Sequence, residues 1–203
     1  TRLGLPTSAK DVMNSSAVMV DFLQRRHPGG CLFVVGERSL EEELEDAGFL
    51  LMDAADQIDA VIASFDRTFN YYKLQVAFDA IRAGAHFYAT NADRFCPVPG
   101  GGQPDAAAMI AAIEACTDTK VEAVVGKPSQ YMAQAILSLL DLPAEQCIMI
   151  GDRLETDVLL GLNSGMAGAL TLTGATNWKM VRHSQVQPTF ILRTLADLIP
   201  EID

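Results

Sequence analysis

The sequence predicts an α/β protein with parallel strands, built as two successive α/β units. Short runs that are apolar at every position alternate with amphipathic helical patterns along most of the 203 residues. A continuously apolar strand is typical of a parallel sheet that helices cover on both faces. One stretch rich in Pro and Gly, residues 93–104, interrupts the alternation, so we interpret it as a loop or linker between the units.

The first unit begins with a helical pattern at Ser15. Residues 1–14 resemble the tail of a preceding core element, because Leu3–Pro6 looks like a helix end followed by a stop signal. The helix predicted from Ser15 to His27 should bury one apolar face, made of Val18, Met19, Phe22 and Leu23. Strands are predicted at residues 31–35, 60–64 and 86–89, with helices that start at Ser39, as an N-cap, and at Tyr71 between them.

The second unit follows the stretch rich in Pro and Gly. Its predicted helices cover residues 105–116, 129–140 and 158–163, with short ones near Met180 and at the end of the chain. Its predicted strands cover residues 123–125, 147–150, 169–172 and 190–192. This order of strands and helices indicates a second parallel α/β unit.

The composition excludes several classes of protein. The net charge of −11 argues against nucleic acid as the main partner, since nucleic-acid binding needs clustered Lys and Arg. No run approaches about 18 apolar residues and the first residues lack a signal-peptide core, so we expect no membrane partner and a cytoplasmic location. The cysteines and histidines are widely spaced, which indicates reduced thiols and no metal cluster built from them.

Two acidic residues follow the apolar run at residues 147–150. Asp152 comes at the end of that strand, and Asp157 comes near the start of the next helix. Ligands of open α/β sheets bind beyond the carboxyl ends of strands. Two carboxylates there suit Mg²⁺, which takes few carboxylates together with water and phosphate oxygens. The alternative is that Asp157 caps its helix and Asp152 fills a turn.

Lys127 directly follows another apolar stretch, residues 123–126. We expect this strand to be the parallel neighbour of the strand that leads to Asp152, which would place a cation beside two acids. Such a group can hold a phosphate with its metal ion, or it can be a structural ion pair. A single Lys after a strand is more often a solvated charge, but the two motifs in this order are more specific than either alone.

The motifs together resemble the NagD-like branch of the haloacid dehalogenase superfamily. The resemblance is carried by Val34–Gly36, Ala89–Asp93 with the Pro/Gly loop after it, Gly126–Ser129, Gly151–Asp157 and Leu172–Gly174. It covers nearly the whole chain. The resemblance implies a Rossmann-like parallel-sheet core with an inserted α/β cap domain, and a Mg²⁺-dependent phosphatase of small phosphorylated metabolites.

The resemblance also implies roles for residues of the second unit. Lys127 matches the lysine that neutralises the nucleophile and the phosphate. Asp152 matches the acid that binds Mg²⁺, and Asp157 matches the acid that supports the metal and its waters. These three residues are therefore the expected catalytic and metal-binding group.

A substrate-binding segment is implied in the first unit. The residues after Asn91, which include Asp93, Phe95 and Cys96, match the part of the cap that reaches into the core site and selects the leaving group. The alternative for Cys96 is a buried spacer. The implied domains are residues 1–14 for the start of the core, 15–102 for the cap and 103–203 for the rest of the core. Whether the cap forms a homodimer stays open.

The chain departs from the pattern of the family in one respect. The family begins with a strand that ends in D-x-D-G and has a later strand that ends in Ser or Thr before Asn, and the matched residues here lie downstream of both. The two D-x-D acids would be the nucleophile and the general acid/base. We therefore expect the nucleophile to lie outside these 203 residues, this chain alone to be inactive, and residues 147–150 to form an unpaired sheet edge.

Two other functions stay open. One is a non-catalytic fragment or pseudo-phosphatase that binds a phosphate ligand or a partner protein. The other is a different doubly wound protein, such as a nucleotide-binding domain, although no G-x-G-x-x-G or Walker loop is present. The sequence does not name the substrate.

Overall fold

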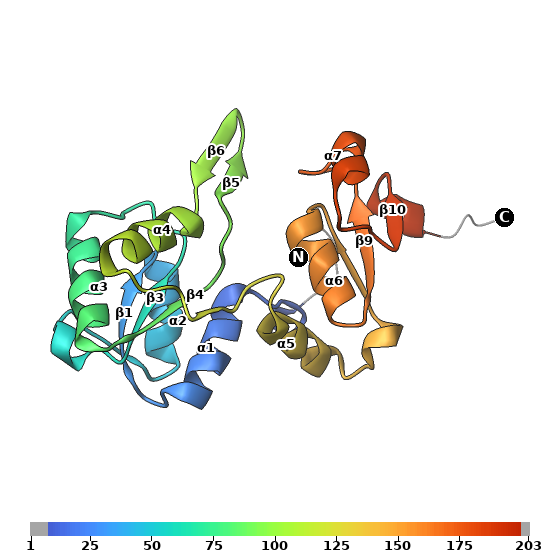
Figure 1. Ribbon diagram of the computed structural model, residues 1–203. Helices are drawn as coiled ribbons and strands as arrows, with labels where there is room; N and C mark the ends of the chain where they lie inside the picture. The colour runs from blue at the N-terminus through green and yellow to red at the C-terminus, as the bar shows by residue number, and fades with distance from the viewer. Residues whose placement is uncertain (1–7, 200–203) are drawn as a thin grey trace. The chain divides into compact units, whose positions relative to one another are not determined.

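The computed structural model of the chain describes residues 8–199. It confirms the predicted α/β class with parallel strands (Figure 1). The chain divides into two compact units, and the division falls between Gly126 and Lys127. None of the described helices has the length and apolar character that crossing a bilayer requires.

The first unit has a five-stranded parallel sheet with helices on both faces (Figure 1). The strands, in the spatial order β2-β1-β3-β4-β7, are β2 (Leu50–Leu51), β1 (Cys31–Val35), β3 (Ala60–Ala63), β4 (His86–Ala89) and β7 (Ala123–Val124). The helices are α1 (Ser15–Arg26), α2 (Arg38–Asp46), α3 (Tyr71–Ala83) and α4 (Ala106–Thr117), with 3₁₀ turns η1 (Ala9–Asp11) and η2 (Ala55–Gln57). Because side chains alternate between sheet faces, Phe87 packs with α3 and α4 while Tyr88 contacts Phe22 of α1.

Two helices of this unit show what local sequence does and does not determine. α1 buries the four residues of its predicted apolar face, and Asn14 caps it by accepting a hydrogen bond from a backbone N–H of the first turn. The prediction that Ser39 caps α2 is wrong. α2 begins at Arg38 without a side-chain cap, because the carboxylate of the preceding Glu37 binds Arg67, 30 residues away.

The stretch rich in Pro and Gly is an antiparallel β-hairpin, so its prediction as a loop is wrong. β5 (Phe95–Val98) pairs with β6 (Gly101–Pro104), and the hairpin extends from the α/β layers of its unit (Figure 1). Gly100 has a φ of 84° at the turn. The Phe95 ring lies over Gly102, where a Cβ would come within 2.8 Å of it. Proline and glycine are tolerated here because both strands have a free edge.

The first unit extends beyond the predicted end of the cap at residue 102. α4 packs against α3, through side chains that include Met109, Ile110 and Ile113, and β7 pairs with β4. The expectation that the strand before Lys127 is the neighbour of the strand before Asp152 is therefore wrong. An apolar run identifies a strand but carries no information on which strand pairs with it.

The second unit has a three-stranded parallel sheet in the order β10-β9-β8 (Figure 1). The strands are β8 (Ile148–Gly151), β9 (Ala167–Thr171) and β10 (Phe190–Leu192). The helices are α5 (Gln130–Leu140), α6 (Leu159–Asn163) and α7 (Trp178–His183), with 3₁₀ turns η3 (Ala144–Gln146) and η5 (Leu195–Leu198) and a π-helical turn η4 (Leu154–Val158). A small core of Leu154, Val158, Leu170 and Val181 holds the turn after β8 against β9.

β8 is an edge strand in the part of the chain that the structure describes. It pairs with β9 on one side, which confirms the predicted free edge at residues 147–150. Ile148 is 44% exposed, and Met149 and Ile150 are partly exposed, so this apolar strand is less covered within its unit than its sequence predicts. An apolar strand with a free edge is a surface on which further strands can pair.

Candidate active site

The turn after β8 holds Asp157 in a buried position. The residue is 4% exposed. Its Oδ1 accepts a hydrogen bond from Lys127 Nζ at 2.6 Å, and its Oδ2 accepts one from the backbone N–H of Arg153 at 3.2 Å. Asp157 lies in the π-helical turn η4, which leads into α6, rather than at the start of a regular α-helix. Single π-turns of this kind occur often at functional sites.

Gly151, the last residue of β8, leaves room for the Asp157 carboxylate. A Cβ at Gly151 would overlap the Cβ and Cγ of Asp157. Because Asp157 is buried and held from two sides, it has little freedom to move away. Packing against Asp157 therefore explains why position 151, directly before Asp152, is a glycine, which the sequence alone did not.

Asp152 is held by the loop that follows β9. Its Oδ2 accepts a hydrogen bond from the backbone N–H of Ala175 at 2.7 Å, and its carbonyl accepts one from Thr176 N–H at 3.1 Å. A Cβ at Gly174 would overlap the side chain of Asp152. The loop after β9 thus fixes the orientation of this carboxylate at the carboxyl end of β8.

Lys127 brings a positive charge to the same turn. Its side chain is 43% exposed, whereas that of Asp157 is 6% exposed, so the ammonium lies at the rim of a buried carboxylate. An ammonium has three N–H donors, and one of them is used by Asp157. Lys127 can therefore also donate to an external anion. The turn joins this cation to two carboxylates, a combination that can bind a phosphate together with a divalent cation.

The substrate-binding residues predicted in the first unit form a separate group at the end of β4. Asn91 Nδ2 donates to Asp93 Oδ2 at 3.2 Å and to Asp105 Oδ1 at 3.0 Å, which ties the end of β4 to the start of α4. Phe95 opens the β5–β6 hairpin and is 52% exposed. Cys96 is partly exposed rather than a buried spacer.

Comparison with known proteins identifies the family. A family model described as HAD-hydrolase-like matches residues 124–198, and one described as haloacid dehalogenase-like hydrolase matches residues 1–50. The chain is 36% identical to the sugar-phosphatase AraL of Bacillus subtilis (strain 168), over 96% of this chain and 71% of that protein. The chain belongs to the haloacid dehalogenase-like hydrolase family. It is also 31% identical to the dihydroxyacetone phosphatase of Corynebacterium glutamicum (strain R), over 96% of this chain and 70% of that protein.

Solved structures that are similar to this hydrolase include nitrophenylphosphatases and a putative nagD protein. The 4-nitrophenylphosphatase of Thermotoga maritima superposes with a TM-score of 0.91 at 31% identity, over 97% of this chain and 75% of that one. The p-nitrophenyl phosphatase of Archaeoglobus fulgidus superposes with a TM-score of 0.90 at 28% identity, over 97% of this chain and 76% of that one. Both comparisons agree with the resemblance that the sequence motifs indicated.

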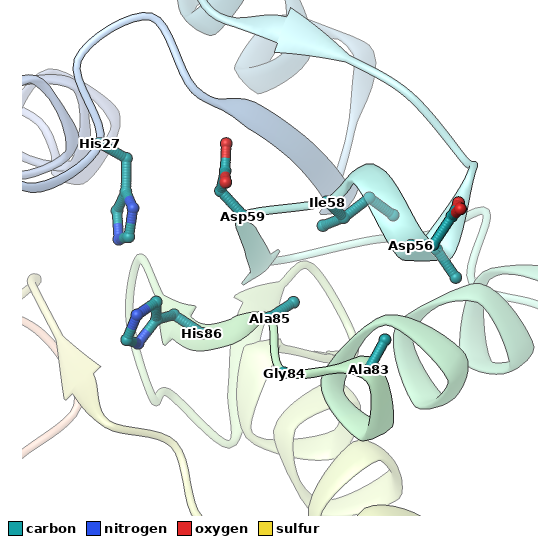
Figure 2. Close-up of a pocket in the computed structure, with 9 residues that line it drawn as sticks. His27, Asp56, Ile58, Asp59, Ala83, Gly84, Ala85 and His86 are labelled. Atoms are coloured by element: carbon teal, nitrogen blue, oxygen red, sulfur yellow. The ribbon is translucent and has the colours of Figure 1, made fainter.

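The hydrolase also has a group of titratable side chains at the amino ends of β3 and β4 (Figure 2). A cavity of about 300 Å³ is lined there by His27, Asp56, Asp59 and His86. The ring centroids of the two histidines are 5.0 Å apart, and His86 Nδ1 pairs with Glu122 Oε2 at 2.9 Å. Burial lowers the pKa of His27, and the nearby His86 lowers it further.

Sequence reasoning found the charged residues of the turn but missed what holds them. Gly151 and Gly174 each lie against one of the two carboxylates. The available signal for Gly151 was its place directly before Asp152, whereas Gly174 lies in the loop after β9, far from that turn in the sequence. The contact of His27 with His86 left no signal, because the two residues come from distant parts of the chain. Long-range contacts of this kind follow from sheet topology, which the sequence pattern did not determine.

Proposed function

We propose that this chain is a Mg²⁺-dependent phosphatase that hydrolyses phosphomonoesters of small metabolites through an aspartyl-phosphate intermediate. The observation that carries the proposal is the contact of Lys127 with Asp157 at the carboxyl end of β8, with Asp152 on the same turn. The names of the relatives, a sugar phosphatase and a dihydroxyacetone phosphatase, support sugar phosphates and similar small phosphates as the first substrates to test.

The carboxylate oxygens on this turn are the type of ligand that Mg²⁺ prefers. Among residues 8–199, no group of three or more His, Cys, Asp or Glu could hold a metal ion by itself. Mg²⁺ needs only one or two carboxylates, because it keeps several waters and takes phosphate oxygens of the substrate. Asp152 would bind it directly, and Asp157, whose two oxygens are engaged, would support the site. When bound, the ion supplies charge neutralisation at the transferring phosphoryl group.

Lys127 would neutralise the phosphate from the side of Asp157. Phosphoryl transfer depends mostly on positioning and on neutralising charge, and a partly exposed ammonium can do both. In the proposed reaction an aspartate attacks phosphorus, the leaving oxygen takes a proton, and water then hydrolyses the aspartyl phosphate. We place that aspartate and the proton donor outside the 203 residues, which contain no D-x-D-G.

Substrate choice is assigned to the first unit. We propose that Asn91, Asp93, Phe95 and Cys96 lie on the segment that selects the leaving group, with the exposed Phe95 and the partly exposed Cys96 of the hairpin in direct contact with it. Asn91 and Asp93 would shape the base of that segment. In this proposal residues 15–102 form the cap, residues 1–14 and 103–203 belong to the core, the enzyme is cytoplasmic, and a homodimer through the cap is one assembly to test by light scattering.

A substrate panel tests the proposal. The complete protein is assayed against sugar phosphates, phosphoglycolate, nucleotide monophosphates, pyridoxal phosphate and p-nitrophenyl phosphate, with Mg²⁺ and with a chelator. We expect turnover that depends on Mg²⁺ and is lost in Asp152→Asn, and no turnover by the 203 residues alone. Turnover that survives both the chelator and Asp152→Asn would contradict the metal site. Activity of the 203 residues alone would place the nucleophile within them.

A further inference from the structure

The parallel sheet of the first unit has a topological switch point between β1 and β3. Its order β2-β1-β3-β4-β7 places β2 on one side of β1 and the later strands of this sheet on the other. The connections after β1 and β3 therefore leave the sheet in opposite directions. In open parallel sheets of this order, small molecules bind in the crevice at the carboxyl ends of the two strands at the switch point.

A cavity lies at that position. It has a volume of about 570 Å³ and is lined by Gly36, Glu37, Arg38, Glu41, Arg67, Thr68 and Lys73. A second cavity of about 440 Å³ shares Arg38, Glu41 and Lys73 with it and adds apolar side chains that include Leu51 and Met52, together with Tyr72. Both volumes are in the range of small-molecule sites. The second cavity combines apolar side chains with charged ones, which include Glu45 and Asp53.

The floor of the crevice is held by Lys73. Its Nζ donates to Gly36 O at 3.0 Å, to Asp66 Oδ2 at 2.6 Å and to Thr68 Oγ1 at 2.9 Å. These bonds join the end of β1, the loop after β3 and the first turn of α3. The Asp66 side chain is fully buried and that of Lys73 is 16% exposed, so this group is a fixed support with its three donors in use.

The ion pair at the mouth of the crevice, Arg67 with Glu37, is more exposed than the pair of Lys73 with Asp66, so an external anion can compete for Arg67. Arg67 Nε and Nη2 donate to the two carboxylate oxygens of Glu37, each at 2.6 Å, across the crevice from the loop after β3 to the turn after β1. Arg67 lowers the pKa of Glu37 to about 2, so this carboxylate stays ionised at neutral pH. The planar fork of an arginine binds carboxylate and phosphate in the same two-point geometry.

We propose that the crevice between β1 and β3 is a second small-molecule site, which takes a phosphorylated metabolite whose phosphate displaces Glu37 from Arg67. The site uses none of the residues proposed for the phosphatase reaction and so goes beyond that function. A phosphate is favoured over a carboxylate because a phosphate dianion carries more charge and keeps the two-point contact with Arg67, whose side chain is 61% exposed. Arg38 also lines the cavity, but it is already paired with Glu41, Glu42 and Glu45. The body of the metabolite would lie along the second cavity, beside Tyr72 and Met52.

Binding to the full ¹⁵N-labelled chain tests the proposal. The probe is phenylphosphonate, whose carbon–phosphorus bond a phosphatase does not cleave. The titration is done in a Lys127→Ala background, so that the result does not depend on the proposed active site. We expect saturable amide shifts at Gly36 and Thr68, and weaker binding of benzoate. Absence of these shifts, or equal affinity for benzoate, would overturn the proposal.

Two variants of the ion pair make the test specific. Arg67→Gln should weaken phenylphosphonate binding by about tenfold or more, because a charge-assisted two-point contact is lost. Glu37→Gln should strengthen it, since the competing carboxylate is gone. The exposed Arg82→Gln on α3 is the matched control and should bind like the parent. Thermal unfolding of each variant confirms that it is folded. Equal affinity of Glu37→Gln, Arg67→Gln and the control would overturn the proposal.

Discussion

Asp152 and Asp157 lie on one turn but differ in how the fold uses their oxygens. Both carboxylate oxygens of Asp157 accept hydrogen bonds, from Lys127 and from the backbone N–H of Arg153. The carboxylate of Asp152 accepts one at Oδ2, from the backbone N–H of Ala175. We predict that Asp152→Asn lowers Mg²⁺ affinity by about tenfold or more and that Asp157→Asn lowers it less. Calorimetric titration of the complete protein measures both, with the exposed Glu155→Gln as control. Parent-like affinity in Asp152→Asn would contradict direct binding.

The position of His27, at the amino ends of β3 and β4 in the first unit, predicts that the stability of the protein depends on pH. His27 lies near His86 and Asp59 (Figure 2). Its pKa is lowered from 6.5, mainly by burial and then by His86, while Arg26 lowers it and Asp59 and Glu122 raise it by smaller amounts. The unfolded chain therefore binds a proton more readily than the folded chain does. Stability should fall as the pH drops below about 6.5, where the unfolded histidine begins to gain its proton.

Thermal unfolding between pH 7.5 and pH 5 measures this effect. His27→Gln should flatten the pH dependence of the melting temperature, because the group whose pKa shifts is removed. The exposed His183→Gln on α7 should leave the dependence as it is in the parent. An unchanged slope in His27→Gln would show that another group controls acid stability.

At the scale of elements, the β5–β6 hairpin is where substrate choice should be adjustable. Its first residue, Phe95, is 52% exposed, and its edges are free of the main sheet. Exchanging Arg94, Phe95 and Cys96 for other side chains should reorder kcat/KM among phosphorylated substrates, because only contacts to the leaving group change. Mg²⁺ affinity should not change. An unchanged order of substrates would show that the hairpin only connects β4 to α4 and has no role in substrate choice.

The free edge of β8 makes a prediction that is independent of catalysis. β3 is flanked by β1 and β4, whereas β8 pairs with β9 alone among the described strands. Hydrogen exchange of the 203-residue chain should therefore be faster in β8 than in β3, because peptide groups with one partner strand open more easily. Equal, high protection of β8 and β3 would mean that another strand covers the edge.

The sequence predicted those elements whose determinants are local. α1 has its apolar face and its limits within thirteen positions, and the alternation of strands and helices gave the α/β class. The start of α2 was missed because Glu37 is engaged by Arg67, far along the chain. The partner of β7 was missed because its apolar residues fit β4 as well as any other strand.

At the scale of the molecule, the charged group of the candidate site was expected but its construction was not. The sequence led us to expect a cation beside two acids, and Lys127 does contact Asp157. The contact does not arise from adjacent strands, since β7 and β8 belong to different sheets. The glycines that make space for the two carboxylates became evident only from their packing. The catalytic roles of these residues stay predictions.

The turnover of Lys127→Ala tests the central claim most directly. The claim is that Lys127, held on Asp157, neutralises the phosphate during transfer. In the complete protein with saturating Mg²⁺, kcat for p-nitrophenyl phosphate should fall at least about 100-fold, because a charge contact made in the transition state is lost. The exposed Lys179→Ala on α7 should turn over like the parent. A folded Lys127→Ala variant with a near-normal kcat would contradict the account and remove this turn from the chemistry.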